Sequence, residues 1–428
     1  MSAAASNCYK IHRVWVFLSV GVALLHSLAL AAANDVEISS PVLIVQGPPG
    51  EQRWGRYQFP SIYRMDGNRL MVSVHVEADA AEAYGLPSRL FVSSDGGASW
   101  REDSGAMKRP HGLRLPNGDW LRIDTPAALR VEKLKFPQPA GQMTSYSLTY
   151  TLYRVADLPP ALRRIFFRRF TRRSWHSQSA ELEDPLALRY VVDGRFPMIW
   201  WGDLRTTPDG QILAVTYPSI TQSGSRFVAN AACFRSQDFG RTWNLQGRIA
   251  YAPDPKADPK ADLRDGFTEP AFEILADGSL LAVLRTTDGH GIGPMYHSYS
   301  QDSGKTWTQP VAFAPSGVLP RLLRLGNGVL VLASGRPGAE LRFSFDGRGE
   351  SWTPPYPLVT LSSDKAQVDS CGYTDLVALD ANTFLVVYSW FRMPDTEGRP
   401  RKSILVRRVR VPMPEPLPPK RDVNPAGG

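Results

Sequence analysis

Residues 93–100, SSDGGASW, carry a pattern that returns three times later in the 428-residue chain. Each copy combines Ser, Asp, Gly, Ser or Thr, and a closing Trp, and the copies start 143, 64 and 44 residues apart. A repeat near 45 residues is the size of one blade of a β-propeller. The later copies are SQDFGRTW at 236–243, SQDSGKTW at 300–307 and SFDGRGESW at 344–352, the last one residue longer.

The residue types of this repeat favour a turn. Asp accepts backbone N–H bonds, Gly adopts a left-handed dihedral, and Trp packs between sheets. We therefore predict that the aspartates fasten turns at the rim of a blade and are not catalysts.

A second pattern precedes the repeats, in which a turn with Asp or Asn and Gly leads into alternating or continuous apolar residues. Such turns favour tight β-hairpins. Six hairpins predict an all-β, six-bladed propeller. The segments are MDGNRLMVSVHV, LPNGDWLRID, PDGQILAVTY, ADGSLLAVLR, GNGVLVLASG and DANTFLVVYS, with upstream strands that begin near Pro60, Gly112, Pro197, Pro270, Pro320 and Tyr373.

Composition agrees with this architecture. The chain is 43% apolar and 21% charged, with 35 Gly and 36 Pro, which excludes a disordered protein or a coiled coil. The net charge of +8 favours anionic partners, but no phosphate loop or zinc-finger spacing indicates nucleic acid. Its three cysteines lack metal-site spacing, so nothing in the sequence implies a metal.

The two ends of the chain read as separate segments. Residues 1–33 combine Lys10 and Arg13 with an apolar run to Ala33, as in a cleaved secretory signal, and an uncleaved single-span anchor is the alternative. We therefore expect a secreted or periplasmic propeller over 34–411. The Pro-rich residues 412–428 form a tail.

One internal segment is unusually basic. Arg163–Arg173 contains six arginines interleaved with phenylalanines and reads as an insertion in blade two. One interpretation is an amphipathic helix that binds an anionic membrane or glycan surface. The other is a solvent-exposed segment of blade two whose aromatic side chains pack on the propeller. Cys233 and Cys371 are read either as a disulfide or as two core thiols.

The repeats and hairpins together resemble those of the sialidase (neuraminidase) family, whose six-bladed propellers carry such Asp boxes. The resemblance spans residues 55–410. CGYTDLVALDANTFLVVYSW resembles the family's segment with a nucleophilic tyrosine, which implies Tyr373 in that role. GFTEPAFEILADGSLLAVLRTT resembles the partner segment and implies Glu269 as its base.

The same resemblance implies an acid and a substrate-binding set. Asp79, in HVEADAAEAYG, fits the acid/base position best, and Glu77 and Glu82 are the alternatives. Arg285 and Arg336 match two of the three arginines that bind the substrate carboxylate, and Arg342 is the alternative to Arg336.

One position departs from the family pattern. Where the family has an aromatic residue, Arg, an aliphatic residue and Pro, this chain has Tyr57, Gln58, Phe59 and Pro60. Gln58 therefore stands where the first arginine is expected. Arg195 has the right local motif but lies two blades later.

These matches imply a retaining exo-glycosidase that releases sialic acid or a related acidic sugar, by a mechanism that requires neither an organic cofactor nor a metal. Two alternatives stay open: a non-catalytic propeller that binds acidic glycans, and a scaffold that docks protein partners through its Arg-rich segment. Aromatic candidates for stacking on the sugar, or for packing between blades, are Trp200, Trp201, His290 and Tyr296.

Overall fold

The computed structural model describes residues 36–287, 293–359 and 369–412. The predicted signal at 1–33, nearly all of the predicted tail and His290 lie outside the described residues. Within those ranges no helix has the length and apolar character needed to cross a bilayer. The predicted all-β class is confirmed, because the helices in these ranges are single 3-10 turns. These turns are η1 (Asp66–Asn68), η2 (Ala81–Ala83), η3 (Ala106–Lys108), η4 (Val131–Lys133), η5 (Val155–Asp157), η6 (Pro160–Leu162) and η7 (Ala261–Leu263).

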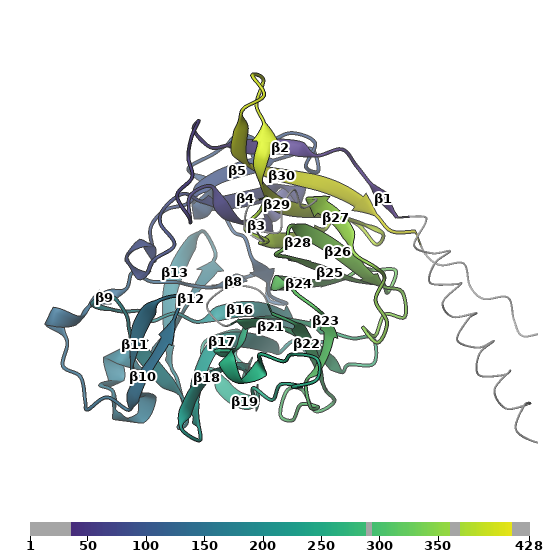
Figure 1. The fold of residues 1–428 in the computed structure, drawn as a ribbon. Helices are drawn as coiled ribbons and strands as arrows, with labels where there is room; N and C mark the ends of the chain where they lie inside the picture. The colour runs from purple at the N-terminus through teal and green to yellow at the C-terminus, as the bar shows by residue number, and fades with distance from the viewer. Residues whose placement is uncertain (1–35, 288–292, 360–368, 413–428) are drawn as a thin grey trace, which may run out of the picture.

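Most strands form antiparallel meanders of four (Figure 1). The first sheet holds β3 (Gln58–Arg64), β4 (Leu70–His75), β5 (Arg89–Ser93) and β6 (Arg101–Glu102). The next holds β7 (Leu113–Arg114), β8 (Trp120–Ile123), β12 (Arg164–Thr171) and β13 (Ser174–Glu181). Another holds β24 (Val318–Arg324), β25 (Leu330–Gly335), β26 (Ala339–Ser344) and β27 (Tyr356–Val359).

An eleven-stranded sheet joins two further meanders to an inserted hairpin. One meander is β16 (Trp201–Thr206), β17 (Ile212–Ser223), β18 (Arg226–Ser236) and β19 (Asn244–Ile249). The other is β20 (Gly266–Ile274), β21 (Leu280–Thr287), β22 (Met295–Ser300) and β23 (Val311–Ala314). The insertion contributes β10 (Gly141–Ser145), β11 (Leu148–Arg154) and β14 (Leu188–Val191), beside the small pair β9 (Leu129–Arg130) and β15 (Arg195–Phe196).

The two ends of the described chain meet in one sheet. β28 (Thr374–Ala378), β29 (Thr383–Pro394) and β30 (Pro400–Arg410) are completed by the N-terminal strands β1 (Glu37–Ile38) and β2 (Val42–Gln46). β2 runs antiparallel to β30, with Val42 opposite Val406. The sheets lie around a common centre (Figure 1). The first strands contact one another in the order β3, β28, β24, β20, β16 and β7. An isolated bridge between Met65 and His111 lies between the end of β3 and the start of β7.

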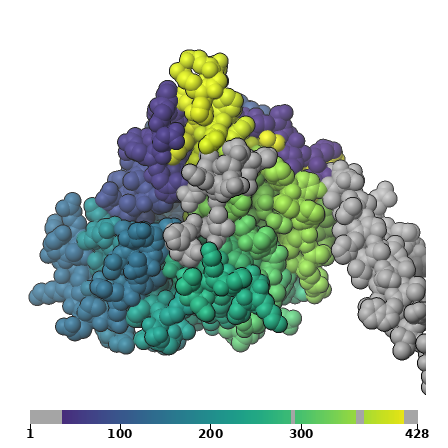
Figure 2. Space-filling model, in the orientation of Figure 1, coloured from purple at the N-terminus to yellow at the C-terminus, as the bar shows by residue number. Residues whose placement is uncertain are grey.

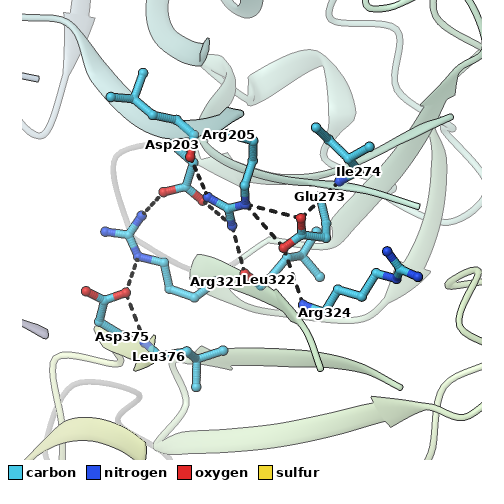
Figure 3. Close-up of polar contacts among 10 residues, drawn as sticks. Asp203, Arg205, Glu273, Ile274, Arg321, Leu322, Arg324, Asp375 and Leu376 are labelled. Atoms are coloured by element: carbon cyan, nitrogen blue, oxygen red, sulfur yellow. Dashed lines mark hydrogen bonds and ion pairs between the residues drawn. The ribbon is translucent and has the colours of Figure 1, made fainter. Parts of the chain in front are cut away.

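Charged side chains tie these first strands together near the centre (Figure 3). Arg321 of β24 binds Asp203 of β16 at 2.7 Å and lies 3.5 Å from Asp375 of β28. Asp375 also accepts the backbone N–H of Ile62 in β3 at 2.9 Å. A partly buried arginine is therefore shared by carboxylates from two other sheets.

A second arginine repeats this linkage beside the first. Arg205 of β16 binds Glu273 of β20 at 3.2 Å and donates to the carbonyl of Leu322 in β24 at 3.0 Å. Removing one partner from such a buried pair is costly, because the other charge loses its compensation. The network therefore opposes relative sliding of the first strands.

The four Ser-Asp-Gly-Trp repeats each follow the third strand of a meander. At 236–243, Asp238 accepts bonds from Ser236 Oγ at 2.9 Å and from the backbone N–H of Thr242 at 2.8 Å. Trp243 Nε1 donates to the carbonyl of Gly240 at 3.1 Å. These bonds hold the turn, which is the role predicted for the aspartate.

The expectation of an amphipathic helix in the Arg-rich segment is wrong. Arg163–Arg173 is mostly strand β12, paired with β8 and β13. Ile165 and Phe167 point into the core, and Phe167 stacks on Trp243 with ring centroids 4.6 Å apart. Burial alternates every two residues, at Ile165, Phe167 and Arg169, as in a strand.

The segment is also not an insertion, because its strand β12 pairs with β8 and β13 inside the four-stranded sheet that β7 and β8 begin. The inserted strands lie on both sides of it: β9, β10 and β11 come before it, and β14 and β15 come after β13. The disulfide alternative is wrong as well, because Cys233 and Cys371 are both free thiols in the core.

Replacement of Asp238 by Ala should lower the free energy of unfolding by about 1–2 kcal/mol at neutral pH, because several turn donors lose their acceptor. Its hydrogen bonds outweigh partial burial and lower the pKa of Asp238. The stabilisation is therefore present above the ordinary carboxyl pKa and fades as pH falls through the lowered value. Urea unfolding at several pH values measures this loss. Asp262→Ala, at an exposed position, is the control and should change little.

Candidate active site

Tyr373 and Glu269 meet between two sheets. Tyr373 directly precedes β28, Glu269 lies in β20, and the phenol hydroxyl of Tyr373 donates a hydrogen bond to Glu269 Oε1. Glu269 is 5% exposed. Arg285 of β21 binds the same carboxylate oxygen at 2.7 Å, and the backbone N–H of Leu319 donates to Oε2 at 2.8 Å. The carboxylate is thus fixed from three sides.

A shared backbone feature aims these side chains. Glu269 has a positive φ of 46°, precedes a proline, and lies at a register shift of the β20–β21 pair. Phe59 and Leu319 have the same three features in β3 and β24, with φ of 49° and 37°. Bulges redirect side chains and concentrate near functional sites. In three first strands, a bulge before the proline turns one residue away from the regular pleat.

Electrostatics separate the roles of the pair. Burial by itself raises the pKa of Glu269, but the Arg285 charge and the hydrogen bonds of Arg285, Tyr373 and Leu319 lower it below its usual value. Burial, followed by the charge of Glu269, raises the pKa of Tyr373 well above 10. At neutral pH the site therefore holds a carboxylate beside a protonated phenol. The phenol can act as a nucleophile only if its proton moves to Glu269 during attack.

Asp79 lies in the loop after β4 and is part of the same surroundings. Trp54 Nε1 donates to Asp79 Oδ2 at 3.0 Å. Asp79 is exposed, yet nearby protein partly desolvates its carboxyl and raises its pKa, with the negative charge of Glu269 as a smaller cause. The fallback acids differ: Glu77 pairs with Arg56 at 3.6 Å and Glu82 is exposed.

Arg336 is the second arginine at the site. It is 3% exposed, donates through Nη2 to the carbonyl of Cys371 at 3.0 Å, and lies over the ring of Trp54 with Cζ 5.3 Å from the centroid. Its charge acts on both Asp79 and Tyr373. Trp54 therefore links the candidate acid to an arginine near the candidate nucleophile.

Two other predicted arginines have different surroundings. Arg342 lies in β26 and pairs with Glu340 at 2.9 Å. Arg195 lies in the two-stranded sheet of the insertion, opposite Arg130. In the described ranges neither contacts Tyr373 or Glu269. The structure thus groups five of the predicted residues: Tyr373, Glu269, Asp79, Arg285 and Arg336.

Gln58 is fully buried and has a structural environment of its own. Its Oε1 accepts hydrogen bonds from the backbone N–H of Gly55 at 2.6 Å and from Lys402 Nζ at 3.0 Å. Lys402 also donates to the carbonyls of Arg53 at 2.6 Å and Arg56 at 3.2 Å. The three donors of the ammonium are therefore used within the protein, and Lys402 does not replace the arginine that Gln58 displaces.

Several residues near the pair were missed from the sequence. Phe59 packs on Tyr373 with ring centroids 4.7 Å apart, and Tyr146 Oη accepts a bond from Arg285 Nη2 at 2.9 Å. Phe59 belongs to the Tyr-Gln-Phe-Pro motif, so it could have been predicted as a site residue from that motif. Tyr146 lies in an insertion outside the blade pattern, so no sequence signal pointed to it.

The aromatic candidates for sugar stacking divide into two groups. Trp201 is partly buried and contacts Tyr217 and Tyr84, with ring centroids 5.6 Å and 5.4 Å away. Trp200 and Tyr296 are buried in the core, at 3% and 0% exposure, so the packing alternative is correct for Trp200 and the stacking expectation is wrong for Tyr296.

No protein-family model matches the chain, and no curated protein matches it. Among solved structures, a Dyadobacter fermentans protein of unknown function is similar at 18% identity and a TM-score of 0.59, over 88% of this chain and 99% of that one. That likeness shows a shared fold.

Two glycosidases are also similar, at lower TM-scores. The α-L-arabinanase of Penicillium chrysogenum has 15% identity and a TM-score of 0.47, over 86% of this chain and 98% of that one. The sialidase of Trypanosoma rangeli has 13% identity and a TM-score of 0.44, over 86% of this chain and 59% of that one.

Replacement of Arg285 by Met should lower the free energy of unfolding by about 3–5 kcal/mol, because Glu269 would keep a buried charge without its partner. The double variant Arg285→Met, Glu269→Gln should recover much of this loss. Urea unfolding measures both, with Arg195→Met as the control. Equal effects of the Arg285 and Arg195 variants would contradict the buried pairing.

Proposed function

We propose that this chain is a glycoside hydrolase of the sialidase type, with Tyr373 as nucleophile, Glu269 as its base and Asp79 as acid/base. The observation that carries the proposal is the hydrogen bond from the Tyr373 phenol to the Glu269 carboxylate. Arg285 holds that carboxylate in place, with its Nη1 2.7 Å from Glu269 Oε1. A nucleophile bonded to a base that is itself held by a third group is the arrangement that covalent catalysis requires.

We further propose that the meanders are six blades of a propeller. The antiparallel order within each meander and the contacts between successive first strands support this. So does the completion of the last sheet by the N-terminal β1 and β2, which joins the ends of the chain. Such a ring brings Tyr373, Glu269 and Asp79, which lie far apart in sequence, to one central site.

Two displacements make up the proposed reaction. In the first, the Tyr373 oxygen attacks the anomeric carbon, its proton passes to Glu269, and Asp79 protonates the departing glycosidic oxygen. In the second, Asp79 takes a proton from water, the water oxygen attacks the same carbon, and the phenol leaves with the proton held by Glu269. Two inversions give net retention of the anomeric configuration.

The proposed substrate is a terminal acidic sugar, with sialic acid first. Its carboxylate sits on the anomeric carbon and would repel a carboxylate nucleophile, whereas a neutral phenol avoids this repulsion. Arg285 and Arg336 supply two guanidinium groups near Tyr373, and a planar guanidinium suits a carboxylate because it donates parallel hydrogen bonds. Gln58 replaces the third, so binding of the carboxylate should be weaker than with three.

A second candidate function follows from Gln58. Because Gln58 is neutral and the ammonium of Lys402 is bound within the protein, the site lacks one expected cation, which favours a propeller that binds acidic glycans without cleaving them. In either case residues 1–33, as a secretory signal, would direct the protein out of the cytosol. The exposed arginines of the 163–173 segment would then meet anionic surfaces there.

The variant Tyr373→Phe should lower kcat/KM for a fluorogenic sialoside by about 100-fold or more, because the nucleophilic oxygen is lost while the ring remains. Tyr299→Phe, on an outer part of a blade, should change it little. A neutral fluorogenic arabinofuranoside tests the preference for an acidic sugar. A wild-type protein that binds sialosides without turnover would contradict hydrolysis and support the glycan-binding alternative.

The pH dependence of kcat/KM should have two limbs. Activity needs ionised Glu269, so it falls as pH drops through the lowered pKa of that group. It also needs protonated Asp79, so it falls as pH rises through the raised pKa of that group. Asp79→Asn should remove the alkaline limb, most visibly with a substrate whose leaving group needs no proton. An unchanged alkaline limb in this variant would assign the acid to another residue.

A further inference from the structure

The inserted hairpin β10–β11 reaches the candidate site with its tip. Ser145 and Leu148 are paired, so Tyr146 and Ser147 form a two-residue loop, with φ of 49° and 61°. Loops with two left-handed residues favour Asn-Gly or Gly-Gly, and a bulky residue in this conformation is strained. Tyr146 therefore adopts a costly backbone conformation at this tip.

Three contacts hold the tip against the site. Ser145 Oγ donates to Asp265 Oδ2 at 2.6 Å. Tyr146 Oη accepts a bond from Arg285 Nη2 at 2.9 Å and lies 3.0 Å from Thr287 Oγ1. Tyr146 is 48% exposed, whereas Arg285 beneath it is 3% exposed. A surface tyrosine thus contributes to covering a buried arginine.

The hydrogen bonds of Arg285 show what is covered. Nη1 binds Glu269, and Nη2 binds Tyr146. Nε is buried and, within the described part of the chain, has no hydrogen-bond partner. Nε and Nη2 form the side-on edge of a guanidinium, whose two parallel N–H groups match the two oxygens of a carboxylate. The Tyr146 hydroxyl satisfies one donor of this edge and leaves the other unmet, which is unfavourable.

We propose that Tyr146 is a specificity-determining residue. Its hydroxyl occupies the position on Arg285 where the carboxylate of an acidic sugar binds, and it leaves this position when such a sugar enters. This inference rests on the proposed function. A carboxylate satisfies both Nε and Nη2, so it outcompetes a hydroxyl that satisfies one. A neutral sugar has no group that makes this exchange favourable, and the tyrosine stays in place against it.

The test compares the binding of N-acetylneuraminic acid and of its methyl ester by titration calorimetry. Tyr146→Phe keeps the ring but removes the competing oxygen, so the Kd of the acid should fall about tenfold. The Kd of the ester, which lacks the charge, should stay within about twofold. Tyr146→Ala should change affinity for the acid in the same direction. Thr149→Ala, at an exposed position of the same hairpin, should match the wild type.

The outcomes separate this inference from the proposed function. If the wild type binds the acid and Tyr146→Phe binds it equally or more weakly, the hydroxyl does not compete with the carboxylate and only this inference is overturned. If no protein binds the acid, the acidic-sugar function is overturned and the inference with it. Melting temperatures of all variants show whether a change in affinity reflects loss of folding.

Discussion

A buried carboxylate that must stay charged is the constraint on which the rest of this site depends. Glu269 is 5% exposed, and burial alone would raise its pKa and neutralise it. Arg285 and the backbone N–H of Leu319 hold it ionised, and the Tyr373 phenol adds a third bond. These partners come from β21, from β24 and from the start of β28, so the carboxylate keeps its charge only while several sheets stay in register.

The ion pairs a few residues along the same strands explain how that register is kept. Arg321 joins Asp203 and Asp375, which lies two residues after Tyr373. Arg205 joins Glu273, which lies four residues after Glu269. The strands that carry the candidate catalytic pair are thus cross-linked by charge beside it (Figure 3). In the space-filling view the N-terminal residues, in purple, lie against the C-terminal residues, in yellow, where β2 pairs with β30 (Figure 2).

Local patterns made much of the fold predictable, and their absence marks where prediction failed. The Asp238 turn and the Gly-containing hairpins depend on residues close in sequence, so they could be predicted. The motifs also indicated Tyr373 and Glu269, which the structure places in contact. The 163–173 segment was misread because its apolar residues do not alternate in sequence: one buried position of the strand is Arg169, whose charge is paired with Asp119. Tyr146 and the Lys402–Gln58 contact were missed because they depend on tertiary neighbours hundreds of residues away or in an insertion.

In the proposed reaction the Tyr373 oxygen forms a covalent bond to the sugar, and the decisive experiment is to trap that species. The enzyme is mixed with an activated sialoside, and the reaction is quenched with acid within milliseconds. The protein is then digested and its peptides are mapped by mass spectrometry. We expect a mass increase of one sialosyl residue on the peptide that contains Tyr373, and none in Tyr373→Phe. Release of product with no adduct on this peptide, and with inverted anomeric configuration, would contradict it.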